Sequence, residues 1–468
     1  MKVHLVAICG VGMSALAGLL RAAGHDVTGS DENVYPPAST LLAALGIPVH
    51  TGYDPACLDG VDLVVCGNAV RRTNPEAMAA AERGLRTLSM PAVLEELFLV
   101  GRTPLVVAGT HGKTTSAAML AWVLGRTGRD PGFLIGGVPL GVGRSFALGS
   151  GRCFVVEGDE YDSAYFDKEP KFLHYRPELL LLTALEFDHA DIYRDLDHVK
   201  SAFRKLLGIL PAKVPLVACG DFPHLTDVLG DGREEVVRFG VGEHNDWRVT
   251  DLMDDGALRC TVREHGRAVG RLTLQLPGAI NARNALGVLL LATRAGVGWD
   301  EAVATLAEFR GVRRRQEVIS TGGGVVVIDD FAHHPTAIAG TLAAVRLRYP
   351  GRRLRAVFEP RSNTSRRRVF EREFVSALAT ADEAVVADVF VKPGDPIPPE
   401  ERLAPQTVVA GLVARGTKAS LLPAASEIRD YLVATARPGD VLVVMSNGAF
   451  GGLPALLAAA FGGVPADA

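Results

Sequence analysis

The stretch that decides the fold is LVVAGTHGKTTSAAML, residues 105–120. An apolar strand leads into a glycine-rich turn, and Lys-Thr-Thr then opens a segment with helical apolar spacing. In such a turn the backbone N–H groups face a phosphate chain, and a lysine neutralises the outer phosphate oxygens. The spacing Gly-x-x-Gly-Lys is shorter than in the usual phosphate loop, but the same chemistry applies. We therefore predict an ATP site made by Gly109, Thr110, His111, Gly112, Lys113, Thr114 and Thr115.

A second glycine-rich turn, ICGVGMSA, lies at residues 8–15. Its pattern Gly10-x-Gly12-x-x-Ala15 follows an apolar strand and opens a helical segment, which is typical of a site for a diphosphate nucleotide. Asp31 lies about where an acidic residue would meet a ribose hydroxyl. Taken alone, this pattern indicates NAD or another diphosphate nucleotide. The alternative is a tight turn that uses glycine only for packing.

The composition bounds the class of protein. The 468 residues suggest about three domains at roughly 150 residues each. A net charge of −4 gives no general attraction to nucleic acid or to an anionic membrane, so we expect neither as a partner. The six cysteines show no metal-binding spacing, and no signal-like segment opens the chain. We therefore expect a cytoplasmic protein with reduced thiols.

Short apolar runs alternate with helical patterns along the chain, which predicts an α/β fold. We expect buried strands at 3–8, 61–66, 105–109, 153–158, 178–185, 214–219, 324–330, 354–359, 383–389 and 440–447. Residues 236–276 alternate differently and predict an antiparallel insert. The expected domains are a Rossmann-like one (1–103), a central ATPase-like one with a phosphate loop and a mostly parallel sheet (104–314), and a second Rossmann-like one (315–468).

Acidic side chains follow two of these strands. The segment VVEGDEYD supplies Glu157, Asp159, Glu160 and Asp162, and LEFDHAD supplies Glu186, Asp188, His189 and Asp191. Carboxylate oxygens at strand ends beside a phosphate loop suit Mg²⁺. Most of these acids are expected to be ordinary loop residues.

The combination resembles the Mur ligases, a family of ATP-dependent amide-forming enzymes of peptidoglycan synthesis and recycling. The segments that carry the resemblance, in order, are GTHGKTT (109–115), LEFDHADIY (185–193), GAINARNAL (278–286), FRGVRRRQE (309–317) and DDFAHHPT (329–336). The resemblance covers nearly the whole chain. It implies a first domain for a UDP-sugar, a second for ATP and a third for the incoming amino acid or peptide. The glycine turn at 8–15 would then bind the UDP-sugar, and the turn at 109–115 would bind ATP.

Within the family, the chain resembles most the members that join UDP-N-acetylmuramate to the murein tripeptide L-Ala-γ-D-Glu-meso-diaminopimelate. The segments that indicate this are NVYPPASTLL, PGFLIGGVP, GDEYDSAYFDKEPKFLHY, FEPRSNT and VMSNGAFGG. The alternative within the family is a UDP-N-acetylmuramate–L-alanine ligase. An NAD-dependent dehydrogenase would explain the glycine turn at residues 8–15 but would leave Lys113 without a role. A non-enzymatic ATP switch is a third alternative.

The resemblance implies roles for individual residues. The Mg²⁺ ligands would be Thr114, Glu157 and His189, with Asp159 and Glu160 beside them or in place of Glu157. The catalytic residues would be Lys113, His189, Arg315 and His333. The ATP site would also include Asn281, Asn284, Arg315 and Asp330. The UDP-sugar would meet Gly10, Gly12, Ser14, Asp31 and Asn68, and the peptide would meet Arg361, Ser362, Asn363, Thr364, Ser446 and Asn447.

Some family features are not matched or not decided. Several relatives use a carbamylated lysine to bridge a second metal, but Lys200 and Lys205 are out of register, and we predict no such modification. The base for the attacking amine is His189 or His333. We expect His334 to be held by a backbone bond. Hinges are expected at Pro104 and near Gly311, and the protein is expected to be a monomer or a weak dimer.

Overall fold

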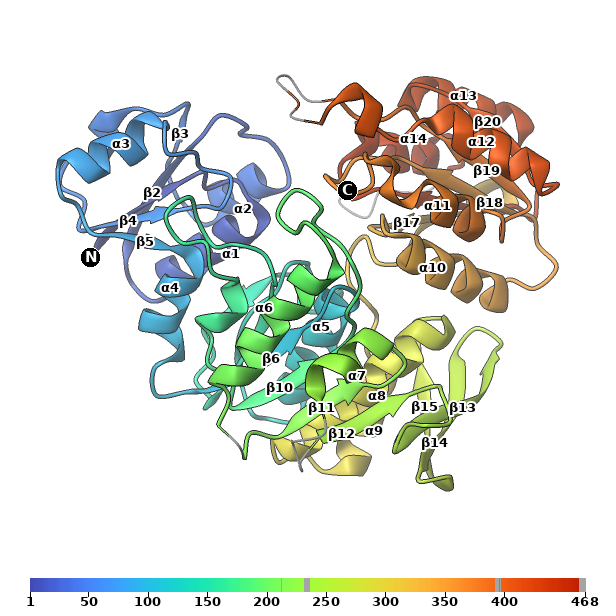
Figure 1. Ribbon diagram of the computed structural model, residues 1–468, viewed down its shortest axis with the longest axis horizontal. Helices are drawn as coiled ribbons and strands as arrows, with labels where there is room; N and C mark the ends of the chain where they lie inside the picture. Colours follow the sequence, from blue (N-terminus) through green and yellow to red (C-terminus); the bar gives the residue numbers. More distant parts are fainter. Residues whose placement is uncertain (212, 231–235, 392–394, 396, 463–468) are drawn as a thin grey trace.

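The computed structural model describes residues 1–211, 213–230, 236–391, 395 and 397–462. The chain forms three lobes, each built on its own sheet, and the first and last lobes both lie against the central one (Figure 1). The expected α/β class is confirmed. We retain 1–103, 104–314 and 315–468 as proposed domain limits.

The N-terminal sheet is parallel throughout, with strand order β3-β2-β1-β4-β5. β2 and β3 lie on one side of β1, and β4 and β5 lie on the other. The strand order therefore reverses at β1, and ligands bind at the carboxyl ends of the strands beside such a reversal. The glycine turn at 10–12 lies there, between β1 and α1. The elements are β1 (Lys2–Val6), α1 (Val11–Ala22), β2 (Asp26–Asp31), α2 (Ala38–Ala44), β3 (Val49–Thr51), β4 (Leu63–Cys66), α3 (Pro75–Glu82), β5 (Thr87–Ser89) and α4 (Met90–Leu94).

The central sheet has ten strands in the order β15-β14-β13-β12-β11-β10-β6-β9-β7-β8. From β7 to β13 all neighbours are parallel, and helices α5 and α8 pack together on it. Its strands are β6 (Thr103–Ala108), β7 (Gly132–Leu134), β8 (Phe146–Ala147), β9 (Cys153–Gly158), β10 (Leu179–Leu182), β11 (Leu216–Cys219), β12 (Val236–Gly240), β13 (Trp247–Asp254), β14 (Leu258–Glu264) and β15 (Arg267–Leu274). Its helices are α5 (Lys113–Arg126), α6 (Leu196–Ile209), α7 (Pro223–Leu229), α8 (Gly278–Arg294) and α9 (Trp299–Ala307).

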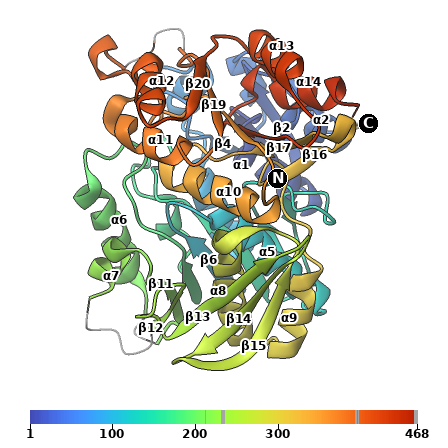
Figure 2. The same ribbon diagram turned by 90° about the vertical axis from the view of Figure 1, so that its right-hand side faces the viewer.

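The C-terminal sheet has the order β16-β17-β21-β18-β19-β20, and only the edge strand β16 is antiparallel. Figure 2 shows α10 on the side of this sheet that faces the central lobe. The strands are β16 (Glu317–Ser320), β17 (Val326–Asp330), β18 (Leu354–Phe358), β19 (Glu383–Val386), β20 (Lys418–Leu421) and β21 (Val441–Met445). The helices are α10 (Pro335–Arg348), α11 (Glu371–Leu378), α12 (Pro405–Ala414), α13 (Ala425–Thr435) and α14 (Leu453–Ala460).

The apolar cores are shared unequally between the lobes. One continuous cluster of buried side chains runs from the N-terminal sheet into the central lobe, for example from Leu16 to Leu120. At the crossing, Phe146 packs so closely on Gly18 that an added Cβ would lie 2.2 Å from its ring. The buried clusters on the two faces of the C-terminal sheet are separate from it.

All ten strands expected from apolar runs are present as β1, β4, β6, β9, β10, β11, β17, β18, β19 and β21. The antiparallel insert begins later than predicted. Its first strand, β12, is parallel to β11, and β13 is parallel to β12, so antiparallel pairing starts between β13 and β14. Among the described residues, no helix combines the length and apolar character needed to span a membrane.

Candidate active site

A cleft of about 560 Å³ lies where the three lobes meet. The N-terminal lobe contributes Gly12 and Asn68, beside the phosphate loop of the central lobe. The predicted site residues that line the cleft are Gly12, Asn68, Thr110, His111, Gly112, Lys113, Thr114, Thr115, Glu157, His189, Asn281, Asn284, Arg315, Asp330, His333, Ser362, Asn363, Thr364 and Asn447. The predicted residues outside its lining are Gly10, Ser14, Asp31, Gly109, Arg361 and Ser446.

The phosphate loop joins β6 to the start of α5. Gly109 and Gly112 have φ of 138° and 80°, where a side chain is rarely accommodated. An added Cβ on Gly109 would lie 2.7 Å from the backbone nitrogen of Ala184. The turn therefore needs glycine at both positions, and it leaves the N-terminus of α5 facing the cleft, an arrangement that binds anions.

Lys113 is held inside the cleft by two acceptors. Its Nζ donates to the carbonyl of Gly109 at 2.6 Å and to Oε2 of Glu160 at 2.8 Å. Burial lowers the pKa of Lys113, but the carboxylates of Glu160 and Asp159 raise it by more than burial lowers it. The net shift of the pKa is upward. The lysine is therefore charged at neutral pH, as phosphate binding requires.

Thr114, Glu157 and Arg315 form a connected group. The Thr114 hydroxyl donates to Oε2 of Glu157 at 3.1 Å and accepts from Nη2 of Arg315 at 3.2 Å. The N–H of Gly136 donates to Oε1 of Glu157 at 2.6 Å. Arg315 comes from the segment between the central and C-terminal lobes, so it brings that segment to the phosphate loop. Burial raises the pKa of Glu157, which is the response of a carboxylate that lacks a full partner.

His189 lies close to the same group but faces another carboxylate. Its Nε2 is 3.4 Å from Oε1 of Glu160. Its φ is 54°, an uncommon conformation for a non-glycine residue that is often found at functional sites. Burial lowers the pKa of His189, but Glu160 and Asp188 raise it to about 9. Of the predicted Mg²⁺ ligands, Thr114 and Glu157 are therefore in direct contact, whereas His189 pairs with Glu160.

Asn281 and Asp330 fix the segment between the second and third lobes. The Asn281 amide donates to Oε1 of Gln316 at 2.8 Å, and Oδ2 of Asp330 accepts from the N–H of Gln316 at 2.8 Å. Asn284 packs against Gly112, because an added Cβ there would lie 2.9 Å from its Oδ1. These side chains hold the wall of the cleft beside the phosphate loop.

His333 lines the cleft with one nitrogen already engaged. Its Nδ1 is 3.0 Å from the carbonyl of Phe331, which makes Nδ1 the donor, and its Nε2 is 3.9 Å from Oδ2 of Asp188. Burial lowers the pKa of His333. The imidazole is therefore neutral at neutral pH, with a lone pair on Nε2.

The loops predicted to bind peptide divide into two groups. Asn363 donates to Asp191 at 2.6 Å, and Thr364 accepts from the N–H of Ala190 at 3.1 Å, so both contact the central lobe. Ser446 is buried, and its hydroxyl donates to Glu359 at 2.5 Å. The Arg361 guanidinium lies 3.8 Å from the ring centroid of Phe390. Ser446 and Arg361 therefore contact other residues of the C-terminal lobe and do not line the cleft.

The predicted UDP-sugar residues also divide. Asp31 accepts from the N–H of Cys9 at 2.9 Å and from that of Asn33 at 2.8 Å. The hydroxyl of Ser14 is buried and donates to the carbonyl of Val11 at 3.1 Å. Both side chains therefore hold the backbone around the glycine turn, while Gly12 and Asn68 face the cleft.

Comparison with known proteins finds one family along most of the chain. Three family domains match in order: "Mur ligase family, catalytic domain" at residues 2–100, "Mur ligase middle domain" at 107–292 and "Mur ligase, glutamate ligase domain" at 314–448. The chain belongs to the Mur ligase family. Mur ligases are ATP-dependent enzymes that form amide bonds, so this protein is a ligase that uses ATP. This result replaces the dehydrogenase and ATP-switch alternatives.

Individual relatives of this Mur ligase have two kinds of name. UDP-N-acetylmuramate–L-alanyl-γ-D-glutamyl-meso-2,6-diaminoheptandioate ligase of Escherichia coli is 41% identical over 97% of this chain and 96% of its own. UDP-N-acetylmuramate–L-alanine ligase of Burkholderia cenocepacia is 35% identical, with 97% of each chain covered. The crystal structure of a murein peptide ligase from Psychrobacter arcticus superposes with a TM-score of 0.73 at 35% identity and covers 100% of both chains.

Several residues of this Mur ligase site were missed by the sequence reasoning. Lys171 pairs with Asp159 at 3.1 Å, and Gln316 joins Asn281 to Asp330. Arg314 turns away from Arg315 and donates to the carbonyls of Ser446 at 2.9 Å and Gly448 at 2.5 Å. A run of three arginines indicates a basic segment but does not show which side chain points inward. The resemblance singled out Arg315, and the fold shows what Arg314 does instead.

Three further side chains of the Mur ligase have partners of their own. Lys200 pairs with Asp227 at 3.0 Å, and Lys205 pairs with the exposed Glu169 at 2.7 Å. His334 meets the backbone as predicted, with Nε2 3.2 Å from the carbonyl of Phe187.

Proposed function

We propose that this Mur ligase joins UDP-N-acetylmuramate to the murein tripeptide L-Ala-γ-D-Glu-meso-diaminopimelate, with ATP as the energy source. The observation that carries the proposal is that one cleft is lined by residues of all three lobes. Gly12 and Asn68 of the N-terminal lobe, Lys113 of the central lobe and Asn363 of the C-terminal lobe all line it. A sugar nucleotide, ATP and a peptide held by three lobes would meet there.

The chemistry begins with a carboxylate, which is a poor acyl donor because its leaving oxygen is too basic. The lactyl carboxylate of UDP-N-acetylmuramate attacks the γ-phosphorus of ATP, ADP leaves, and an acyl phosphate forms. The peptide amine then adds to the acyl carbon, loses a proton and expels inorganic phosphate. We propose that Lys113 and Arg315, which both contact the phosphate loop, stabilise charge on the transferring phosphoryl group.

The donors beside Lys113 fit Mg²⁺. The Thr114 hydroxyl and the Glu157 carboxylate are hard oxygen ligands, and the raised pKa of Glu157, caused mainly by burial, is consistent with a missing cationic partner. Bound there, Mg²⁺ would neutralise phosphate charge. Thr114 and Glu157 would hold it directly, and His189 would approach it after leaving Glu160.

His333 is the residue we propose as base for the amine. Its Nδ1–H is directed to the carbonyl of Phe331, so the lone pair of Nε2 remains available in the cleft. Asp188, 3.9 Å from Nε2, would stabilise the imidazolium that forms when the amine gives up its proton. These contacts support His333 more than His189, whose Nε2 faces Glu160.

The decisive experiment measures phosphate release by the full-length protein with ATP, Mg²⁺ and UDP-N-acetylmuramate. One reaction receives the tripeptide and the other receives L-alanine. We expect kcat/KM to favour the tripeptide by at least about a hundredfold, since a site with several peptide contacts loses binding energy with a single amino acid. Preference for L-alanine would instead establish the alternative, an L-alanine ligase, and product without ATP would refute both.

A ligase that accepts an intact tripeptide would return released wall peptide to a nucleotide precursor. We therefore propose a role in peptidoglycan recycling. The predicted monomer or weak dimer is testable by light scattering of the purified protein.

A further inference from the structure

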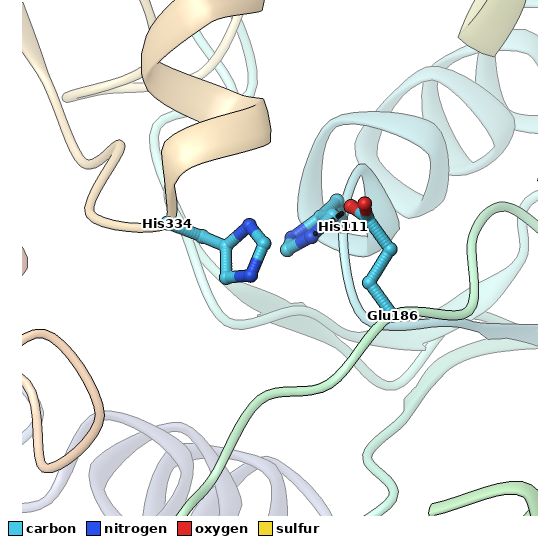
Figure 3. Close-up of side chains that lie close together, drawn as sticks. All are labelled: His111, Glu186 and His334. Carbon is cyan, nitrogen blue, oxygen red and sulfur yellow. Dashed lines mark ion pairs between the residues drawn. The ribbon is translucent and has the colours of Figure 1, made fainter. Parts of the chain in front are cut away.

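His111 belongs to the phosphate loop, and its side chain contacts the C-terminal lobe. Figure 3 shows its ring with His334 on one side and the carboxylate of Glu186 on the other. The ring centroids of His111 and His334 are 4.4 Å apart, and Nε2 of His111 is 2.9 Å from Oε2 of Glu186. The His111 side chain is only 9% exposed. A side chain of the nucleotide loop is thus enclosed partly by another lobe.

The second oxygen of Glu186 is bound by that other lobe. The hydroxyl of Thr336, in the first turn of α10, donates to Oε1 of Glu186 at 3.0 Å. The N–H of Thr336 in turn donates to Nδ1 of His334, which caps the helix. Glu186 therefore connects the imidazole of the phosphate loop to the N-terminus of α10 through its two oxygens.

Two histidines and a carboxylate also form a set of metal ligands. Both nitrogens of His334 are engaged, however, because Nε2 faces the carbonyl of Phe187 at 3.2 Å and Nδ1 accepts from Thr336 at 3.3 Å. In this arrangement no lone pair of His334 is left for a metal. The hydrogen bonds favour a direct contact between lobes.

We propose that His111, Glu186 and Thr336 form a docking contact through which the C-terminal lobe detects the phosphate loop, so that nucleotide and peptide strengthen each other's binding. This inference rests on the proposed function, because it assigns the peptide to the C-terminal lobe. A nucleotide that orders the loop fixes His111 and with it Glu186. Thr336 and His334 then have a formed surface to meet, and a peptide that draws the lobe in fixes the loop in return.

Residues that follow Glu186 extend this contact. Ala190 donates to Thr364 and Asp191 accepts from Asn363, both in a loop predicted to bind peptide. Glu186 and Thr336 are positioning residues, because they act through His111 and α10. Their loss should change the coupling between the two substrates more than the affinity for either one alone.

The test measures the dissociation constant of the non-hydrolysable ATP analogue AMP-PNP by calorimetry, with and without the tripeptide. Mg²⁺ and UDP-N-acetylmuramate are present throughout. We expect the tripeptide to tighten AMP-PNP binding to the wild type by at least about fivefold, and AMP-PNP to tighten tripeptide binding by the same factor. In Thr336→Val, which keeps the β-branched shape and the backbone cap, this factor should fall below about twofold. AMP-PNP affinity without peptide should stay within about twofold of wild type.

Two further variants make the result specific. Glu186→Gln should also lower the coupling factor, and the double variant should be no worse than the more affected single one, because both act on one contact. Thr380→Val is the matched control, since this exposed hydroxyl donates only to the carbonyl of Ala377 within its own lobe. It should keep the wild-type factor.

Wild-type coupling in Thr336→Val, or an equal loss of AMP-PNP affinity with and without peptide, would overturn the docking contact. If the wild type binds no tripeptide, the proposed substrate is wrong. The same coupling is then measured with L-alanine, so the two failures remain distinguishable.

Discussion

The two glycine turns of this ligase look alike in sequence but differ in why they need glycine. In the phosphate loop, Gly109 and Gly112 have left-handed backbone conformations and no room for a Cβ. In the N-terminal turn, Gly10 has an ordinary φ of −63°, and the atoms nearest to an added Cβ are 3.8 Å away. The phosphate loop needs glycine in order to fold, whereas Gly10 of the N-terminal turn leaves open space. A glycine motif alone does not distinguish these two uses.

The largest expected effect separates the turns by charge. Lys113→Ala removes the cation of the phosphate loop, for which the N-terminal turn has no counterpart. Loss of one such group typically raises the barrier by about 3 kcal/mol, so kcat should fall at least about a hundredfold in the phosphate-release assay. Lys205→Ala is the control, since this exposed side chain pairs with Glu169 on the surface. A smaller loss than tenfold would contradict the role of Lys113.

The next effect tests the backbone requirement directly. Gly109→Ala places a Cβ 2.3 Å from the Thr183 hydroxyl at a φ of 138°, so the loop has to move. We expect about 1–3 kcal/mol of lost stability and weaker AMP-PNP binding, read by thermal melting and calorimetry. An unchanged melting temperature would show that the phosphate loop tolerates a side chain at Gly109. The two turns would then not differ in their requirement for glycine.

A smaller effect on activity is expected at Asp31, which supports the backbone of the N-terminal turn. Asp31→Ala leaves the N–H groups of Cys9 and Asn33 without their acceptor. Since a hydrogen bond to a charged group contributes about 1.5–3 kcal/mol, KM for UDP-N-acetylmuramate should rise by about tenfold or more, with KM for ATP nearly constant. Equal changes in both constants would indicate general damage to the fold.

The smallest effect on folding is expected at the N-terminal turn itself. Gly10→Ala fits the existing φ and meets no atom closely, so stability should stay the same or rise by about 0.4–1 kcal/mol. The family resemblance implies that the sugar nucleotide meets Gly10. We therefore expect the added methyl group to raise KM for UDP-N-acetylmuramate several-fold. A loss of stability as large as that of Gly109→Ala would end the distinction between the turns.

The sequence predicts local features of this enzyme well. The apolar runs give ten strands, and the glycine-lysine turn gives the phosphate loop, because both depend on neighbouring residues. The run of three arginines does not by itself show which one turns inward, and only the family resemblance singled out Arg315. Arg314 and Arg315 differ in what the fold places beside them. The sequence also does not show that Ser446 is buried on Glu359, because β21 and β18 become neighbours only through the crossover topology.

The unequal division of the apolar cores has a consequence for heating. The N-terminal and central lobes share one continuous interior across Gly18 and Phe146, so they should melt as one cooperative unit. The C-terminal lobe has interiors of its own and should give a separate transition in calorimetry. A hinge at Pro104 would have to separate this shared apolar packing, whereas one near Gly311 would not. We therefore expect the segment around Gly311 to move more during turnover than Pro104, and the first two lobes to move as one body.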